Sequence, residues 1–272
     1  MRNRPNYLAG MFACVWLAVI AVPLYALLNT AFQSQDVYND RGPLGLPSKL
    51  TLSNFTTVLD SGFAGYIWNT LLVAALTVAI VLLFGVPISY AVVRGTGWWS
   101  RGVFRLFLLG LAIPSQAVII PLFLIINRLG LYDTLWGIVL PTAAFSLPVT
   151  ILVISGGMRE IDSSMYEAMA LDGASPARTL RDLVIPLSRS GLATASVFAA
   201  LQAWNGFLFP LIMTQSEGDK VVTLGLYNFV SEYSANVPAL LAAVVLSAVP
   251  ILVVYLFARR ALVAGLMGAG SK

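Results

Sequence analysis

The chain of 272 residues has no histidine and a single cysteine, Cys14. Without histidine, imidazole-based catalysis, imidazole metal sites and histidine pH switching are all excluded. With one cysteine, no disulfide can form within the chain, and the sequence does not indicate whether the protein faces an oxidising or a reducing compartment.

Charge is also scarce: 10% of the residues are charged and 58% are apolar, and the mean hydropathy is +0.85. Soluble domains carry about 25% charged residues, so this chain could not cover a water-facing surface. The composition therefore predicts a membrane protein. The net charge of +4 does not indicate nucleic-acid binding, because the basic residues form no patch.

The charged residues leave six long charge-free intervals, the shortest of 22 residues (106–127). A helix of that length crosses about 30 Å of hydrocarbon at roughly 1.5 Å per residue. We predict an all-α protein with six spans at about 8–31, 65–93, 105–127, 134–157, 190–214 and 236–259. The start of the chain looks like a cleaved signal peptide, but its apolar run is too long, so an uncleaved first span is favoured. Prolines within the spans predict kinks: Pro87, Pro114, Pro121, Pro141, Pro148 and Pro250.

The basic residues predict the orientation. Twelve of the 16 fall on one side: Arg2, Arg4, Arg94, Arg101, Arg105, Arg159, Arg178, Arg181, Arg189, Arg259, Arg260 and Lys272. The other side holds Arg41, Lys49, Arg128 and Lys220. The richer side is expected to be cytoplasmic, with both termini. The external segments are then near 32–64, 128–133 and 215–236.

The most polar run of the second half, "EAMALDGASPARTLRDLVIP" (167–186), predicts two short cytoplasmic helices. Ser164 and Glu167 fit a capping box, and Gly173 fits a left-handed helix stop. Ser175 and Pro176 fit the start of a second helix, which Pro186 should end. Local physics alone leaves an ordinary amphipathic connector as an equal alternative.

This run resembles the EAA loop of membrane subunits of bacterial ABC importers. The matching residues are Glu167, Ala168, Asp172, Gly173, Ala174 and Pro186, with Met169 in place of the usual second alanine. Other departures are Asp162, Leu180 and a terminal G-S-K. "QAWNGFLFPLIM" (202–213), "SNFTTVL" (53–59), "WNTLLVA" (68–74) and residues 238–270 resemble the carbohydrate-uptake branch, most closely its MalG-type second permease.

The resemblance implies a type I importer permease, one transmembrane domain (1–272) in a bacterial inner membrane. Residues 158–189 would be its coupling loop to the ATPase, where the Glu167 carboxylate either meets a basic residue of that partner or only caps its helix. The implied partners are a second homologous permease, two ATPase subunits and an extracytoplasmic solute-binding protein. ATP and Mg²⁺ would be bound by the ATPase, because Lys49, Lys220 and Lys272 have no phosphate-loop context.

The six charge-free intervals leave no charged side chain at membrane depth, which favours a neutral, hydroxyl-rich solute over an ion and argues against an ion-coupled carrier or a membrane enzyme. Polar candidates for the path are Asn69, Ser89, Ser115, Gln116, Gln202 and Asn205, with Tyr90 and Trp204 as stacking surfaces. Each could instead bond a neighbouring helix or sit at the membrane interface. A permease for glycerol phosphate, polyamine or peptide, and an assembly scaffold, remain as alternatives.

Overall fold

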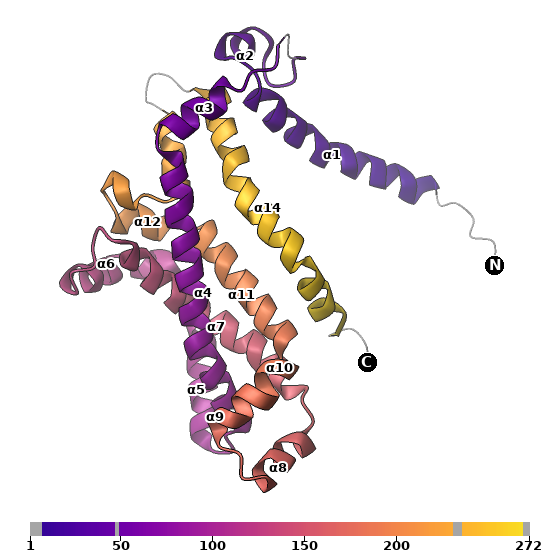
Figure 1. The fold of residues 1–272 in the computed structure, drawn as a ribbon, viewed down its shortest axis with the longest axis vertical. Coiled ribbons are helices and arrows are strands. Elements are labelled where there is room, and N and C mark those ends of the chain that lie inside the picture. The colour runs from indigo at the N-terminus through magenta and orange to yellow at the C-terminus, as the bar shows by residue number, and fades with distance from the viewer. Residues whose placement is uncertain (1–6, 47–48, 231–235, 269–272) are drawn as a thin grey trace. The chain divides into compact units, whose positions relative to one another are not determined.

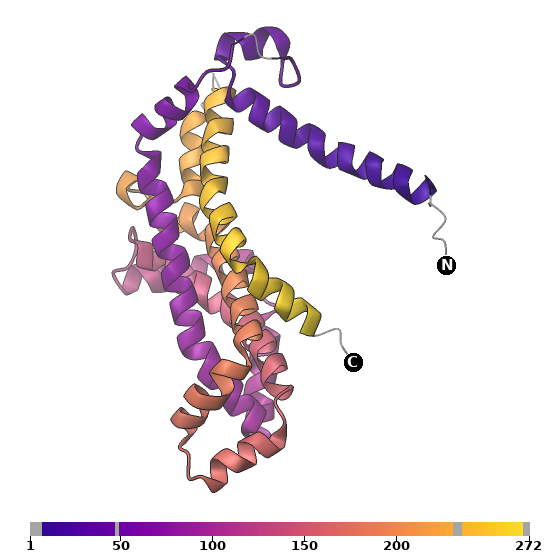
Figure 2. The same ribbon diagram turned by 45° about the vertical axis from the view of Figure 1, so that its right-hand side comes forward.

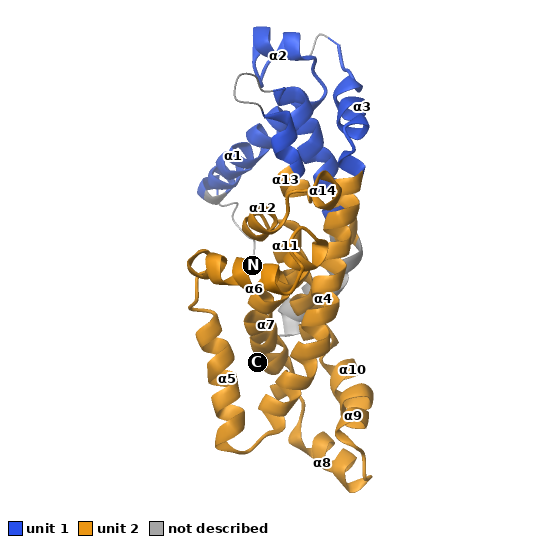
Figure 3. Cartoon of the chain, turned by 90° about the vertical axis from the view of Figure 1, so that its left-hand side faces the viewer, with its two compact units in different colours: residues 1–64, 225–251 blue, residues 65–224, 252–272 orange. Residues whose placement is uncertain are grey.

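A computed structural model describes residues 7–46, 49–230 and 236–268, and its regular secondary structure is helical (Figure 1). Arg2, Arg4, Lys272 and the G-S-K ending lie outside these residues, and so do the side chains of Arg259 and Arg260. The chain forms two compact units, residues 1–64 with 225–251 and residues 65–224 with 252–272 (Figure 3). That the whole chain is one transmembrane domain stays a prediction.

The first unit contains one long apolar helix and several short ones. Its elements are α1 (Tyr7–Ala31), α2 (Gln35–Arg41), α3 (Ser53–Asp60), η4 (Leu226–Phe229) and the first half of α14 (Val237–Gly268). Buried amides hold the segment after α1: Asn54 Nδ2 donates to the carbonyls of Ala31 (2.9 Å) and Gln33 (2.7 Å). Asn29 Nδ2 donates to the Gly45 carbonyl at 2.7 Å. These bonds satisfy carbonyls at the end of α1 and in the segments that follow it, which no regular helix pairs.

The second unit contains three helices that run side by side, α4 (Phe63–Arg94), α7 (Leu135–Arg159) and α11 (Arg189–Trp204) (Figures 1 and 2). Its remaining elements are α5 (Trp98–Gly110), η1 (Ser115–Val118), α6 (Ile119–Arg128), α8 (Ser163–Leu171), α9 (Pro176–Thr179), the π-helical η2 (Leu180–Val184), α10 (Ile185–Leu187), α12 (Leu208–Met213), η3 (Glu217–Asp219) and α13 (Val222–Gly225).

Small side chains let these three helices approach closely. Val81 of α4, Ala143 of α7 and Ala199 of α11 form one buried cluster midway along the bundle. At Gly85 an added Cβ would lie 3.0 Å from Thr150 Cγ2, so α4 and α7 are in close contact there. Packing of small residues is the usual means of helix association in a membrane, because lipid supplies no hydrophobic driving force between helices.

Among the residues that the structure describes, four helices are long and apolar enough to cross a membrane: α1, α4, α7 and α14 through Val254. They match the first, second, fourth and sixth predicted spans. The chain is therefore a multi-pass membrane protein, with up to six spans if each of two bent helix pairs counts as one.

The third and fifth predicted spans are not single helices. Instead of one helix over 105–127, α5 and the η1–α6 segment meet at 93°. Pro114, which has no N–H to donate, lies at this break in an extended conformation. Instead of reaching residue 214, α11 ends at Trp204 and α12 starts at Leu208, so the regular fifth helix is only about 24 Å long.

Candidate functional site

The segment 158–189 forms a folded unit at one end of the α4–α7–α11 bundle (Figure 2). Its first helix, α8, is capped by Asp162, whose carboxylate accepts a hydrogen bond from the Ser164 amide at 2.8 Å. The predicted capping box of Ser164 and Glu167 is therefore wrong, because the N-cap is Asp162, two residues before Ser164. The backbone and hydroxyl hydrogen bonds from Ser164 hold the pKa of Asp162 below its ordinary value.

The end of α8 confirms the predicted glycine stop. Gly173 has φ +69°, where a side chain would be strained, yet a Cβ would meet nothing within 4 Å. The Ala174 amide donates to the Met169 carbonyl (2.9 Å) and the Gly173 amide to the Ala170 carbonyl (3.1 Å). This pair of bonds defines a Schellman motif. Gly173 is therefore needed for the backbone turn, and not because a neighbouring atom would collide with a side chain.

The second helix starts as predicted but ends differently. The Ser175 hydroxyl accepts a bond from the Arg178 amide, and Pro176 occupies the first turn. Pro186 does not end the helix: the chain continues to Leu187 through a π-helical stretch, which shifts the hydrogen-bond register before the proline. The bend comes at Ser188, where this segment meets α11 at 83°.

One face of the segment is anchored to the bundle. Tyr166 is only 5% exposed and packs in a cluster with Val86, Met158, Leu183 and Val184. Its hydroxyl donates to the Met158 carbonyl at 3.3 Å, and desolvation by burial raises its pKa. The sequence analysis did not single out Tyr166. The only signal in the sequence was an aromatic residue within this polar run.

The opposite face of α8 is exposed. Glu167, Ala168 and Asp172 are all solvent-accessible, and Leu171 is 88% exposed. Within the described residues the Glu167 carboxylate makes no hydrogen bond or ion pair. Met169 is half-buried against the cluster that holds Tyr166, Ala174 is half-buried and Pro186 is exposed.

A second candidate site is a cavity of about 260 Å³ where the broken helices meet α7. Of the predicted path residues, Ser115, Gln202 and Asn205 line it, and Gln116 is not among its lining residues. The lining also includes Thr142, Phe145, Ser146 and Phe209, which the sequence analysis did not select.

The remaining path candidates lie elsewhere. Tyr90 is close to the coupling segment, with its ring centroid 6.5 Å from that of Tyr166. Trp204 is 7% exposed. Ser89 is fully buried and donates to the Ile151 carbonyl at 3.4 Å, which matches the alternative of helix–helix bonding. Asn69 donates to the carbonyls of Gly218 (2.7 Å) and Lys220 (2.9 Å) and so holds a loop.

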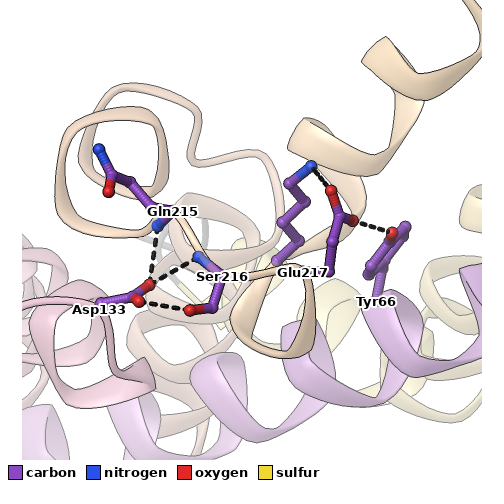
Figure 4. A network of polar contacts seen from close by, with 6 residues as sticks. Tyr66, Asp133, Gln215, Ser216 and Glu217 are labelled. Atoms are coloured by element: carbon purple, nitrogen blue, oxygen red, sulfur yellow. Dashed lines mark hydrogen bonds and ion pairs between the residues drawn. The ribbon is translucent and has the colours of Figure 1, made fainter.

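That loop, residues 214–221, is also fastened at two further points (Figure 4). Asp133, at φ 58°, accepts bonds from the amides of Gln215 and Ser216, both at 2.8 Å, and from the Ser216 hydroxyl. These bonds lower its pKa. Glu217 accepts from Tyr66 Oη at 2.7 Å and pairs with Lys220, and the bond from Lys220 is the main cause of its lowered pKa. The loop therefore has a defined shape.

Several apolar helices long enough to cross a membrane, joined by polar segments, define the class of multi-pass membrane proteins. Residues 81–265 match the family described as "Binding-protein-dependent transport system inner membrane component". The chain belongs to this family. It is a permease subunit of an ABC importer, and the ATPase of such importers is a separate subunit.

Curated relatives match along almost the whole chain. A "Putative ABC transporter permease protein ORF2" of Caldicellulosiruptor sp. is 30% identical over 96% of this chain and 95% of its own. The "Diacetylchitobiose uptake system permease protein NgcG" of Streptomyces coelicolor is 30% identical over 94% of this chain and 85% of its own. The "Trehalose transport system permease protein SugB" of Mycobacterium tuberculosis is 30% identical over 84% of both.

Among solved structures, a subunit of a bacterial ABC transporter "involved in the import of the acidic polysaccharide alginate" has a similar fold. The TM-score is 0.79 at 22% identity, over 96% of this chain and 98% of that chain. A chain of the MetNI methionine ABC transporter matches with a TM-score of 0.59 at 16% identity, over 74% of this chain and 94% of that one.

Proposed function

We propose that this chain is the permease subunit of an ATP-driven importer for a neutral sugar or oligosaccharide, and that residues 158–189 couple it to the ATPase. The single observation that carries the coupling is the two-sided build of α8. Tyr166 anchors the helix in the core of the bundle, while Glu167, Ala168 and Leu171 stay exposed. A partner that moves this face also moves the bundle, because α8 is stiff and its ends are capped.

The assignment to sugars rests on two observations. Several relatives are named as permeases for diacetylchitobiose, trehalose, multiple sugars or glucose. In addition, the predicted spans carry charged side chains only at their ends, Arg105 and Arg259, whereas an anionic solute would favour basic residues along its path. Gln202 and Asn205, which line the cavity, are the path residues proposed here, and a place in the path for Asn69, Tyr90, Gln116 and Trp204 stays a prediction.

In the proposed assembly this subunit pairs with a second, homologous permease and with two ATPase subunits, which bind ATP and Mg²⁺. Its location is a bacterial cytoplasmic membrane, in contact with lipid, with both termini inside. A solute-binding protein docks outside, on the segments near 32–64 and 215–236. The bonds of Asp133 and Glu217 support this docking site, since they hold residues 214–221 in one shape.

The first experiment is to purify the tagged protein gently from its native membrane and to identify its companions. An ATPase, a second permease and a solute-binding protein in stoichiometric amounts support the proposal. Ligand screening of the binding protein would then name the sugar. A chain that purifies without any nucleotide-binding partner, even after crosslinking through residues 162–186, contradicts the coupling role.

The crosslink has a matched control, because Cys14 is the only native cysteine. In a Cys14→Ser background, we expect Leu171→Cys to crosslink to the ATPase. Asp60→Cys, on a segment predicted to be external, should not do so. If both positions or neither crosslink to the ATPase, the proposed docking face is wrong.

A further inference from the structure

Helix α5 lies beside α7 in the second unit (Figure 3) and packs one of its faces against it. On this face Phe104, Phe107 and Leu108 are half-buried. Near its end the two helices are in close contact, since a Cβ added at Gly110 would lie 3.2 Å from Pro148 Cγ. The rest of the surface of α5 therefore points away from the bundle.

A second face of α5 is apolar and exposed. Trp99, Val103 and Leu106 follow one another at intervals of four and three residues, so they form one stripe along the helix. Their exposed fractions are 68%, 38% and 67%. An exposed apolar stripe of this kind indicates a contact with a membrane or with another protein.

A third face, which adjoins the apolar stripe, is basic. Trp98, Arg101 and Arg105 fall on it at intervals of three and four residues, and all three are exposed. Among the residues that the structure describes, neither arginine forms an ion pair. Two like charges four residues apart on a helix repel each other, so an anion bound between them would stabilise this face.

Helices α4 and α7 fix this basic face in position. Arg159, the last residue of α7, places its guanidinium carbon 5.1 Å from the centroid of the Phe104 ring, which is next to Arg105 in the chain. A third cation is therefore held beside the first two. The Ser100 hydroxyl donates to the Val92 carbonyl at 2.7 Å and ties the start of α5 to the end of α4.

Two indole rings lie at the start of the same helix. Trp98 and Trp99 stack with their ring centroids 4.0 Å apart, at an angle of 29°, and both are exposed. Tryptophan is enriched at the level of the lipid headgroups, where an amphipathic ring meets both apolar chains and water. The pair therefore indicates that this end of α5 lies at a membrane surface.

We propose that Arg101, Arg105 and Arg159 bind the phosphate of an anionic phospholipid, whose acyl chains lie along Trp99 and Leu106. The planar fork of an arginine matches the geometry of a phosphate group. A lipid fits better than a soluble anion, because the charged face adjoins an exposed apolar stripe. The predicted orientation places the site in the cytoplasmic leaflet, whose surface is negatively charged. The inference goes beyond solute import and does not depend on which solute is carried.

The test measures which lipid lies against the tryptophan pair. The intact complex is reconstituted in phosphatidylcholine vesicles that contain equal amounts of either brominated phosphatidylglycerol or brominated phosphatidylcholine, because bromine quenches tryptophan fluorescence on contact. The signal of the pair is the difference between the wild type and a Trp98→Phe/Trp99→Phe variant. We expect phosphatidylglycerol to be enriched at the pair at least about fivefold, the factor that one basic residue near an anionic surface contributes.

Two variants relate the enrichment to the arginines. Arg101→Gln/Arg105→Gln should remove it and leave quenching by brominated phosphatidylcholine unchanged, which checks that α5 still folds and faces lipid. Arg128→Gln is the control, since Arg128 is also an exposed arginine without an ion pair among the described residues but lies at the end of α6. It should keep the full enrichment.

Three results would overturn the proposal. Equal quenching by the two lipids in the wild type would mean that the tryptophans lie at an ordinary membrane interface without a lipid site. Enrichment that persists in Arg101→Gln/Arg105→Gln would show that these arginines do not hold the headgroup. A pair that neither lipid quenches would show that a protein subunit covers this face.

Discussion

The guanidinium carbon of Arg94 lies 4.4 Å from the centroid of the Tyr166 ring. Arg94 is the last residue of α4, and Tyr166 is the buried residue of α8, so this pair joins a long span to the coupling segment. The hydroxyl of Tyr166 joins the same helix to the end of α7 through Met158. Two spans therefore meet the coupling segment at one side chain.

Removal of this ring should disconnect ATP hydrolysis from transport. Tyr166→Ala leaves a cavity at the joint, and we expect uptake per ATP hydrolysed to fall at least tenfold in the reconstituted complex. Tyr166→Phe keeps the ring beside Arg94, where a cation–π contact contributes about 0.5–1 kcal/mol, and should retain most coupling. If Tyr166→Phe loses as much coupling as Tyr166→Ala, the hydroxyl bond is the important contact.

The left-handed turn at Gly173 should tolerate few side chains. Because φ is +69°, a non-glycine residue costs about 1–2 kcal/mol there. We expect Gly173→Leu to tilt the second helix and lower transport, while Gly173→Asn, which adopts this conformation more readily, retains more activity. Gly156→Leu is the control, since Gly156 also has open space around it but has no positive φ. Full transport by a normally assembled Gly173→Leu complex would contradict the rigid-turn argument.

The loop at 214–221 should loosen in acid. The bonds from Ser216 and Gln215 hold the pKa of Asp133 below its ordinary value of 3.8. The pKa of Asp133 is lower in the folded protein than in the unfolded chain. The stabilisation that its carboxylate gives the loop is therefore fully present above pH 3.8, and it is lost as the pH falls through the pKa of the folded protein. Hydrogen exchange at the amides of residues 215 and 216, corrected for intrinsic rates, should therefore speed up below pH 3.8.

Two variants serve as controls for the loop. In Asp133→Asn the exchange should be faster at neutral pH and should no longer depend on this titration. Asp60→Asn, at an exposed carboxylate that makes no hydrogen bond among the described residues, should behave like the wild type. Unchanged exchange in Asp133→Asn would show that other contacts hold the loop.

The contact between Gly85 and Thr150 should behave as a coupled pair. Gly85→Ala places a Cβ 3.0 Å from Thr150 Cγ2 and should destabilise the protein by about 1–3 kcal/mol through overpacking. Thr150→Ser removes the methyl group in the way, so the double variant should recover part of the loss. Thermal unfolding in detergent measures this cycle, with Gly10→Ala as a control with nothing within 4 Å. If the effects of Gly85→Ala and Thr150→Ser on the free energy of unfolding simply add in the double variant, α4 and α7 adjust to the added methyl group without strain.

Local signals identified much of the coupling segment. Gly173 and Ser175 act within a few residues of themselves, so their roles follow from chain geometry and could be predicted. The two wrong predictions in this segment also concern local interactions, where two arrangements of the same few residues compete. Asp162 caps α8 in place of Ser164, and the π-helical stretch carries the helix past Pro186. Neither choice is visible from residue type alone, because both alternatives satisfy the same backbone groups.

The sequence by itself determined that this is an all-helical membrane protein, because charge cannot lie in lipid and the gaps between charges mark the apolar helices. Only the tertiary structure decided which polar residues share a site. Gln202 and Asn205 meet Ser115 because two helices break at the same place, while Asn69 bonds a loop about 150 residues away. Such pairings depend on how distant segments pack, and the sequence of a single helix does not specify which segments become its neighbours.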